Sequence, residues 1–283
     1  AASIALKGSG GHYASFLKRG DERSTDVDIK IRVEIGNMPH RKDLEKVFSA
    51  GQAWSMYRDG QDYWMALTPP AFKAPIWMAK MDRTFTRVVV RCGEELVSKE
   101  KGEIQVSDPV CYPLDQILLM HVLAQRRGAL IHAAGIGING MGYLFPGRSG
   151  AGKTTLTRQF AVREDLELLS DDRMVIRGGN GAFRAFGTPW PGDAGIAQNK
   201  SLPLLGIFFI THGASNRIKD MTPQQALERL LPVTSIPWYD GEMIPPILSF
   251  CEDLISHVPV YELFFKPGID LIAVFEAFVG TES

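Results

Sequence analysis

Nine consecutive residues in the middle of the chain have the types and the spacing of a phosphate-binding loop. The segment matches G-x-x-x-x-G-K-[ST] completely and reads Gly147-Arg148-Ser149-Gly150-Ala151-Gly152-Lys153-Thr154-Thr155. Glycines let successive backbone N–H groups turn inward around phosphate oxygens, and a helix that begins there adds its dipole. Lys153 has the reach for the β- and γ-phosphates of a nucleotide, and the hydroxyl of Thr154 is a ligand for Mg²⁺. The loop therefore predicts a nucleotide-binding site.

The residues on either side of this loop place it between a strand and a helix. Residues 142–145 form an apolar strand before it, and residues 154–162 after it favour a helix. Residues 130–138 predict a preceding strand, joined to the first through Asn139-Gly140, a dipeptide that suits a tight hairpin. A glycine turn that merely caps a helix is the weaker interpretation in this context.

Two adjacent carboxylates follow the next apolar segment. Residues 166–169 predict a short strand, and Asp171 and Asp172 follow it. The number of residues between Lys153 and this pair is the number expected if that strand lies beside the loop. Two carboxylates there can divide the work between holding Mg²⁺ and accepting a proton from an attacking hydroxyl. The alternative is a solvated turn, which the phosphate-binding loop makes less favourable.

Together with His132, on the strand before the hairpin, these elements resemble the bacterial HPr kinase/phosphorylase family. The likeness covers residues 125–195 and rests on a histidine, the loop and the Asp pair, which come in this order at similar separations. It implies a kinase that uses ATP and Mg²⁺ on a serine-type hydroxyl, with a core related to that of phosphoenolpyruvate carboxykinase. It also implies that Asp171 is the general base, Asp172 its metal-side partner, and His132 a histidine that hydrogen-bonds near the base. A buried core histidine is the other interpretation of His132. The residues predicted to be catalytic are Asp171, Lys153 and His132.

The chain departs from this family pattern in two places. A Glu-containing signature after the Asp pair is missing, and Asp193 stands near the expected position, either as a metal ligand or as a turn residue with local hydrogen bonds. A later Pro-Gly-Arg-Asn loop has no match, so its arginine needs a substitute to neutralise phosphoryl charge. Arg148, Lys200 and Arg217 are candidates for that cation, or are surface side chains. The predicted metal ligands are Thr154, Asp172 and Asp193.

Composition and charge narrow the class of protein. The chain has 283 residues, of which 45% are hydrophobic, and its 31 basic and 32 acidic side chains leave no basic surplus for nucleic acid. The longest apolar stretch, residues 202–210, is far shorter than the roughly 20 residues of a membrane-spanning helix. The start of the chain lacks a signal-type segment, and three cysteines cannot form a complete disulfide framework. We therefore expect a cytoplasmic protein with buried free thiols and no membrane or nucleic-acid partner.

Hydrophobic patterning predicts three parts in an α/β chain. Residues 1–24 are read as a flexible tail, residues 25–112 as a smaller β-rich domain, and residues 113–283 as the P-loop kinase core. In the β-rich part, strands are predicted at 28–35, 54–57, 63–67, 76–81 and 85–90, and a helix at 41–50. In the second part, helices are predicted at 114–127, 223–231 and 269–278, strands at 204–211 and 258–265, and irregular structure at 236–248.

Three functions remain open from the sequence. The first is a kinase whose acceptor is a protein, a ribosomal peptide precursor or a small molecule. The second is a GTPase-like switch, although Asn199-Lys200-Ser201-Leu202 lacks the Asp of a guanine-reading motif. The third is a nucleotide-sensing module without catalysis, whose N-terminal part binds a partner. A homo-oligomer also stays open.

Overall fold

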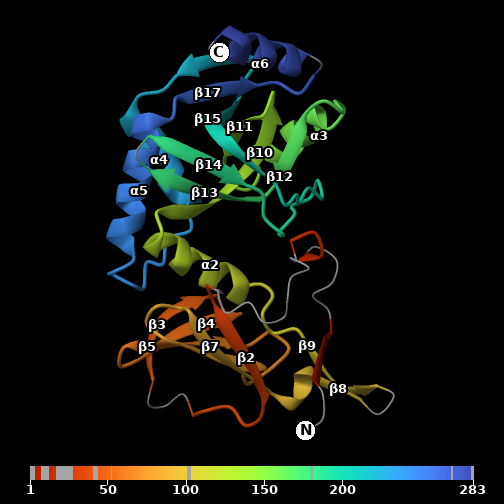
Figure 1. Ribbon diagram of the computed structural model, residues 1–283, viewed down its shortest axis with the longest axis vertical. Helices are drawn as coiled ribbons and strands as arrows, with labels where there is room; N and C mark the ends of the chain where they lie inside the picture. Colours follow the sequence, from red (N-terminus) through yellow and green to blue (C-terminus); the bar gives the residue numbers. More distant parts are fainter. Residues whose placement is uncertain are drawn as a thin grey trace. The chain divides into compact units, whose positions relative to one another are not determined.

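The computed structural model describes residues 4–7, 13–16, 28–40, 44–51, 53–100, 103–179, 181–268 and 270–281. The chain forms two compact units, the first from residues 1–11 and 18–122 and the second from residues 12–17 and 123–283. The protein is a mixed α/β chain with an N-terminal β-sheet and a second, mixed sheet (Figure 1). None of the helices described here combines the length and apolar character that crossing a membrane requires.

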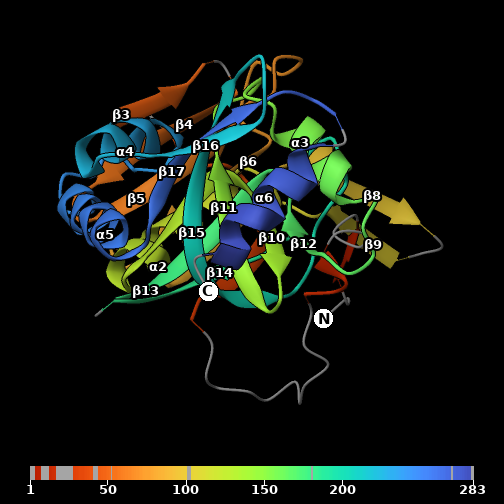
Figure 2. The same cartoon turned by 90° about the horizontal axis from the view of Figure 1, so that it is seen from above.

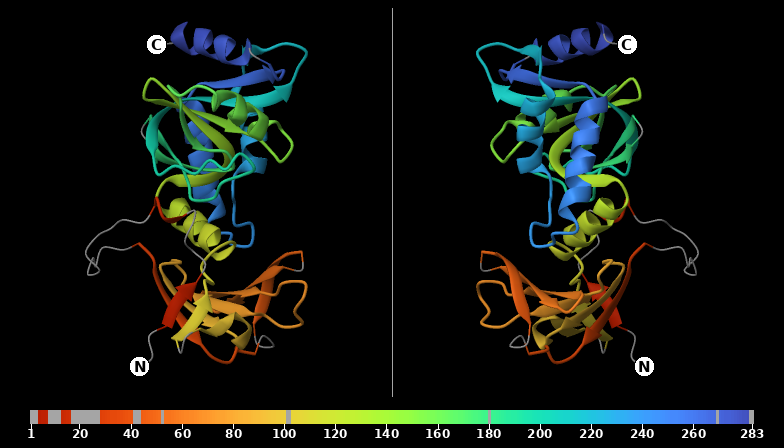
Figure 3. Two further views of the ribbon diagram at one scale, coloured as in Figure 1. Left: turned by 90° about the vertical axis from the view of Figure 1, so that its right-hand side faces the viewer. Right: turned by 90° about the vertical axis from the view of Figure 1, so that its left-hand side faces the viewer.

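The main sheet of the first unit contains six strands, five of which the sequence predicts (Figure 3). Strands β3 to β7 pair antiparallel with their chain neighbours, while β2 adds to β7 in parallel. The strands are β2 (Lys30–Ile35), β3 (Glu45–Ala50), β4 (Trp54–Asp59), β5 (Asp62–Leu67), β6 (Trp77–Met81) and β7 (Arg87–Cys92). Met56, Met65 and Met78 are fully buried, so the Met and aromatic side chains of these strands form core.

One prediction for the first unit is wrong. The helix predicted at 41–50 is strand β3, because pairing with β4 and the contact of Phe48 with Trp54 outweigh the helical spacing of three apolar residues. Residues 41–43 lie outside the described part. Within the tail predicted at 1–24, β1 (Ile4–Lys7) pairs with β9 (Glu103–Ser107), which also pairs with β8 (Val97–Glu100), while residues 1–3, 8–12 and 17–24 lie outside the described part. A strand of four residues is too short to show in the sequence the alternation of polar and apolar residues that predicts a strand.

The second unit is built on an eight-stranded sheet in which β11 also pairs with β15, so that β11, β10, β13, β14 and β15 form a closed ring. Its strands are β10 (Gly128–Ile138), β11 (Met141–Pro146), β12 (Glu167–Ser170), β13 (Arg173–Gly179), β14 (Ala182–Phe186), β15 (Ser201–His212), β16 (Arg217–Asp220) and β17 (Val260–Phe265). Its helices are α3 (Lys153–Phe160), α4 (Pro223–Leu230), α5 (Ile244–His257) and α6 (Asp270–Thr281), while α2 (Leu114–Gln125) spans the boundary between the units. The described residues also form a 3-10 helix in each unit, η2 (Glu94–Leu96) in the first and η3 (Leu231–Val233) in the second.

Alternate side chains of β10 pack into two hydrophobic cores, one on each face of the sheet. Ile131 packs with the helices α4 and α5, whereas Ile136 packs with α3 and α6 (Figure 2). In the second core, Phe275 of α6 contacts Phe145 of β11 and Phe160 of α3. This cluster fixes the strand and the helix that enclose the phosphate-binding loop.

The hairpin predicted at Asn139-Gly140 is confirmed, with φ of 52° and 77° at these two residues and antiparallel pairing of β10 with β11. Two other predictions need correction. Strand β12 pairs with β10 rather than with β11, whose parallel neighbour is β15. The segment predicted to be irregular contains the start of α5, because prolines lack only an N–H that the first turn of a helix leaves unpaired.

Candidate functional site

The predicted phosphate-binding loop, residues 147–155, runs from the end of β11 into α3, between a strand and a helix as the sequence predicts. Gly150 and Gly152 have φ of 81° and 100°, a conformation that other residues rarely adopt. At Gly147, a side chain would bring its Cβ to 2.8 Å from the Cβ of Ala151. The backbone path therefore requires the glycines of the motif.

Lys153 begins α3 and folds back over the loop. Its side chain is buried, and its ammonium donates to the backbone carbonyls of Gly147 at 2.8 Å and Arg148 at 3.2 Å. Burial lowers the pKa of Lys153, while the negative charge of Asp172 acts in the opposite direction. An ammonium has three donors, so the geometry leaves one for a further acceptor in the pocket.

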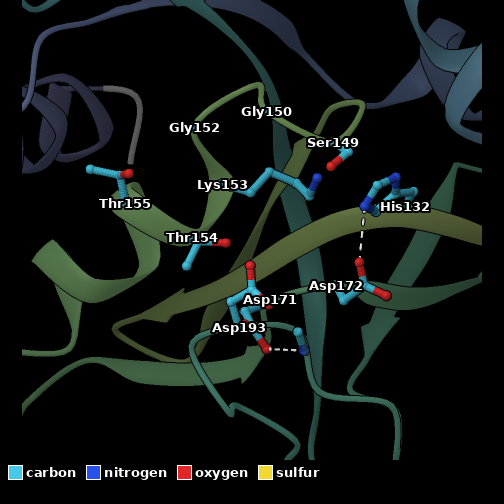
Figure 4. A pocket seen from close by; sticks show the side chains of 11 residues that line it. His132, Ser149, Gly150, Gly152, Lys153, Thr154, Thr155, Asp171, Asp172 and Asp193 are labelled. Carbon is cyan, nitrogen blue, oxygen red and sulfur yellow. Dashed lines mark hydrogen bonds and ion pairs between the residues drawn. The ribbon is translucent and has the colours of Figure 1, made fainter.

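A pocket of about 400 Å³ lies beside the loop (Figure 4). It is bounded by the phosphate-binding loop, by β10, by the Asp pair after β12, and by the segment that follows β14. The lining residues are His132, Ser149, Gly150, Gly152, Lys153, Thr154, Thr155, Asp171, Asp172, Gly192 and Asp193. All the residues predicted to be catalytic and all the predicted metal ligands therefore meet in one place.

Two basic side chains contact the carboxylate of Asp172. The Nε2 of His132 lies 2.9 Å from its Oδ1, and the Nε of Arg173 lies 3.4 Å from its Oδ2. His132 and Arg173 stand directly opposite each other in the pairing of β10 with β13. Burial raises the pKa of Asp172, but the hydrogen bond from His132 and the positive charges of Arg173, His132 and Lys153 outweigh it and hold that pKa below its ordinary value. The geometry therefore favours an ionised carboxylate.

Asp171 has a different environment. It is 2% exposed, and its carboxylate accepts three backbone N–H groups, from Gly192 at 2.8 Å, Ala194 at 2.6 Å and Ile196 at 3.1 Å. A Cβ at Gly192 would lie 2.9 Å from the Oδ2 of Asp171, so glycine is needed where the segment approaches the carboxylate. Asp171 thus fixes residues 192–196, which we call the Asp193 loop.

Asp193 is exposed and lines the pocket, and its backbone carbonyl accepts from Arg158 of α3 at 2.9 Å. Within the described ranges, no group of three or more His, Cys, Asp or Glu side chains is placed to hold a metal ion. The donor set at the pocket, Thr154, Asp172 and Asp193, is nevertheless of the kind that fits Mg²⁺, which binds one or two carboxylates together with substrate phosphates. Glycine backbone and a buried ammonium likewise fit a nucleotide's phosphates.

None of the three residues predicted to substitute for the missing arginine lines this pocket. Arg148 belongs to the loop but its side chain is exposed; Lys200 pairs with Glu167 at 2.8 Å; and Arg217 stacks on a phenylalanine of β17 at 4.0 Å. Arg173, which sequence reasoning missed, is the cation next to the Asp pair, and its Nε is buried with only the ion pair to Asp172. The position of Arg173 directly after the Asp pair in the sequence is the signal from which its place beside these carboxylates could be predicted.

The Asp193 loop should depend on Asp171. We expect Asp171→Asn to lower the free energy of unfolding by about 1.5–3 kcal/mol, because an amide replaces one charged acceptor oxygen with a donor that faces backbone N–H groups. Urea unfolding measures the loss, and hydrogen exchange at Gly192, Ala194 and Ile196 should accelerate. The exposed Asp193→Asn is the matched control. Equal stability of both variants would contradict the role given to Asp171.

The stability that Asp172 contributes should depend on pH. Because the folded-state pKa of Asp172 lies below its ordinary value, its contribution is complete above about pH 5 and declines as the pH falls through that folded-state pKa. Urea midpoints of the unmodified chain and Asp172→Asn, measured in EDTA from pH 7 to pH 3, should therefore converge toward low pH. A difference that stays constant over this range would contradict the ionised pair.

No protein-family profile and no curated protein sequence matches the chain. Among solved structures, the chain is similar to the HPr(Ser) kinase/phosphatase from Coxiella burnetii. The two share 15% identical residues with a TM-score of 0.32, and the match covers 54% of this chain and 95% of that chain. The likeness is therefore a distant structural resemblance over about half of the chain.

Proposed function

We propose that the chain is an ATP-dependent kinase that transfers the γ-phosphoryl group to a serine-type hydroxyl of a protein, a peptide or a small molecule. The observation that carries the proposal is the convergence, in one pocket, of a complete phosphate-binding loop with buried Lys153 and an ionised Asp172 held by His132. Phosphoryl transfer needs positioning and charge stabilisation more than covalent chemistry, and this pocket offers both.

The residues of the pocket divide into two sides. The backbone of the phosphate-binding loop and the ammonium of Lys153 bind and orient the phosphates, and Thr154 and Asp193 are the metal-side groups. Mg-ATP supplies the phosphoryl group. The carboxylates of the pocket face the bound phosphates, and the acceptor hydroxyl has to enter on that side.

Within this proposal, Asp172 rather than Asp171 receives the proton of the acceptor hydroxyl. Asp171 is 2% exposed and its oxygens accept three backbone N–H groups, whereas the Asp172 side chain, although it contacts His132 and Arg173, is 33% exposed and ionised. The hydrogen bond with His132 fixes the orientation of the Asp172 carboxylate. The sequence resemblance implies the opposite assignment, with Asp171 as the base.

A nucleotide-binding regulatory module without transfer is the second candidate. Its support is the sparse donor set for a metal, since the described part of the chain assembles no cluster of three His, Cys, Asp or Glu side chains. A screen with γ-³²P-labelled ATP, Mg²⁺ and serine peptides, free serine and related hydroxyl compounds separates the two. Label in an acceptor supports the kinase, and tight ATP binding without label in any acceptor supports the module.

Loss of the Lys153 ammonium should abolish transfer. We expect Lys153→Ala to keep its fold but to lose phosphoryl transfer and to bind ATP at least tenfold more weakly, because the ammonium is the side-chain cation of the motif at the β- and γ-phosphates. Filter binding and label transfer measure the two effects. Lys200→Ala, which removes an exposed lysine paired with Glu167, should change neither. Near-normal turnover of a folded Lys153→Ala variant would exclude the loop from the reaction.

Loss of the Asp172 carboxylate should lower the rate of transfer without weakening ATP binding. We expect Asp172→Asn to reduce kcat about 10²–10⁴-fold while ATP affinity stays within a few-fold, since it removes a positioned proton acceptor. Asp220→Asn, on the exposed strand β16, is the matched control. If Asp172→Asn retains kcat and instead raises the Mg²⁺ requirement, Asp172 is the metal-side residue and the assignment from the sequence resemblance is favoured.

A further inference from the structure

A short segment from near the start of the chain lies on the stretch that follows the Asp pair. Residues 13–16 belong to the second unit by their contacts, and Figure 1 shows them as the red turn beside the teal loop that follows β14. The indole N–H of Trp190 donates to the hydroxyl of Tyr13 at 3.1 Å. The side-chain amide of Asn199 donates to the backbone carbonyl of Ser15 at 3.0 Å.

The two residues that hold this segment flank the Asp193 loop. Trp190 stands two residues before Gly192, and Asn199 stands three residues after Ile196. The loop between them is fixed by the carboxylate of Asp171 and supplies Asp193 to the pocket. A ligand on Trp190 and Asn199, which we call the Trp190/Asn199 surface, therefore lies next to the wall of the pocket.

We propose that the Trp190/Asn199 surface binds a tyrosine hydroxyl and a backbone carbonyl of a peptide acceptor, and that residues 13–16 occupy it as an internal competitor. This inference rests on the proposed kinase function and narrows its acceptor to a peptide. Trp190 selects an aromatic hydroxyl, and Asn199 binds a backbone carbonyl two residues further along, which any residue supplies. The surface thus selects a peptide that has a tyrosine, and it also binds the backbone carbonyl two residues after that tyrosine.

The bound segment is suited to exchange. It forms a single turn, closed by the hydrogen bond from the backbone N–H of Phe16 to the carbonyl of Tyr13 at 2.8 Å, and Ala14 and Ser15 are exposed. A segment tethered to its own surface competes intramolecularly with any peptide added from outside. A peptide added from outside therefore binds the unmodified chain with an apparent affinity reduced by the occupied fraction.

The test uses a fluorescein-labelled peptide with the sequence of residues 11–18 and the full-length chain, in fluorescence polarisation without nucleotide. We expect Tyr13→Ala, which removes the internal phenol, to bind the peptide at least tenfold more tightly than the unmodified chain does. Adding Asn199→Ala should reverse that gain, and the neighbouring Gln198→Ala, also an exposed amide, should not. A peptide whose tyrosine is replaced by phenylalanine should bind more weakly.

Binding and transfer give separate outcomes. No saturable binding to a folded Tyr13→Ala chain, or equal binding after Asn199→Ala, overturns the surface, even if small hydroxyl compounds are phosphorylated and the kinase stands. Binding with the expected dependence supports the surface. If that chain then transfers no label to any acceptor, the kinase fails although the binding site stands. With transfer, Tyr13→Ala should lower KM for a peptide acceptor and leave kcat unchanged.

Discussion

The carboxylate of Asp171 is the constraint on which the candidate site depends. A buried charge is costly unless hydrogen bonds compensate it, and here three backbone N–H groups of the Asp193 loop supply that compensation. The same contacts join the end of β12 to residues far along the chain and so build one wall of the pocket. With Asp171 committed to this structural task, the adjacent Asp172 is the carboxylate that pairs with His132 at the pocket.

Strand β10 connects the two halves of the pocket. It pairs with β11, which leads into the phosphate-binding loop, and with β12, which leads into the Asp pair, and it carries His132 itself. The aromatic cluster of Phe145, Phe160 and Phe275 fixes β11 and α3 around the loop. A rigid scaffold of this kind lets short loops hold charged groups at fixed separations, which phosphoryl transfer requires.

The parts that sequence reasoning predicts are those with local causes. The glycine pattern of the loop and Asn139-Gly140 are dictated by backbone dihedral angles at those same residues. The separate environments of Asp171 and Asp172 are not visible in the sequence, because they arise from donors more than 20 residues away and from a strand pairing that sets Arg173 opposite His132. Strand β3 was missed for a similar reason, since pairing with β4 decides its conformation.

Calorimetric titration with ATP, AMP and inorganic triphosphate, each with Mg²⁺, tests most directly that this pocket is built for the phosphates of a nucleotide. The account predicts that ATP and triphosphate bind with similar affinity, that AMP binds at least tenfold more weakly, and that Lys153→Ala weakens ATP and triphosphate but not AMP. Absence of ATP binding by the unmodified chain, or equal binding of ATP and AMP, would contradict it.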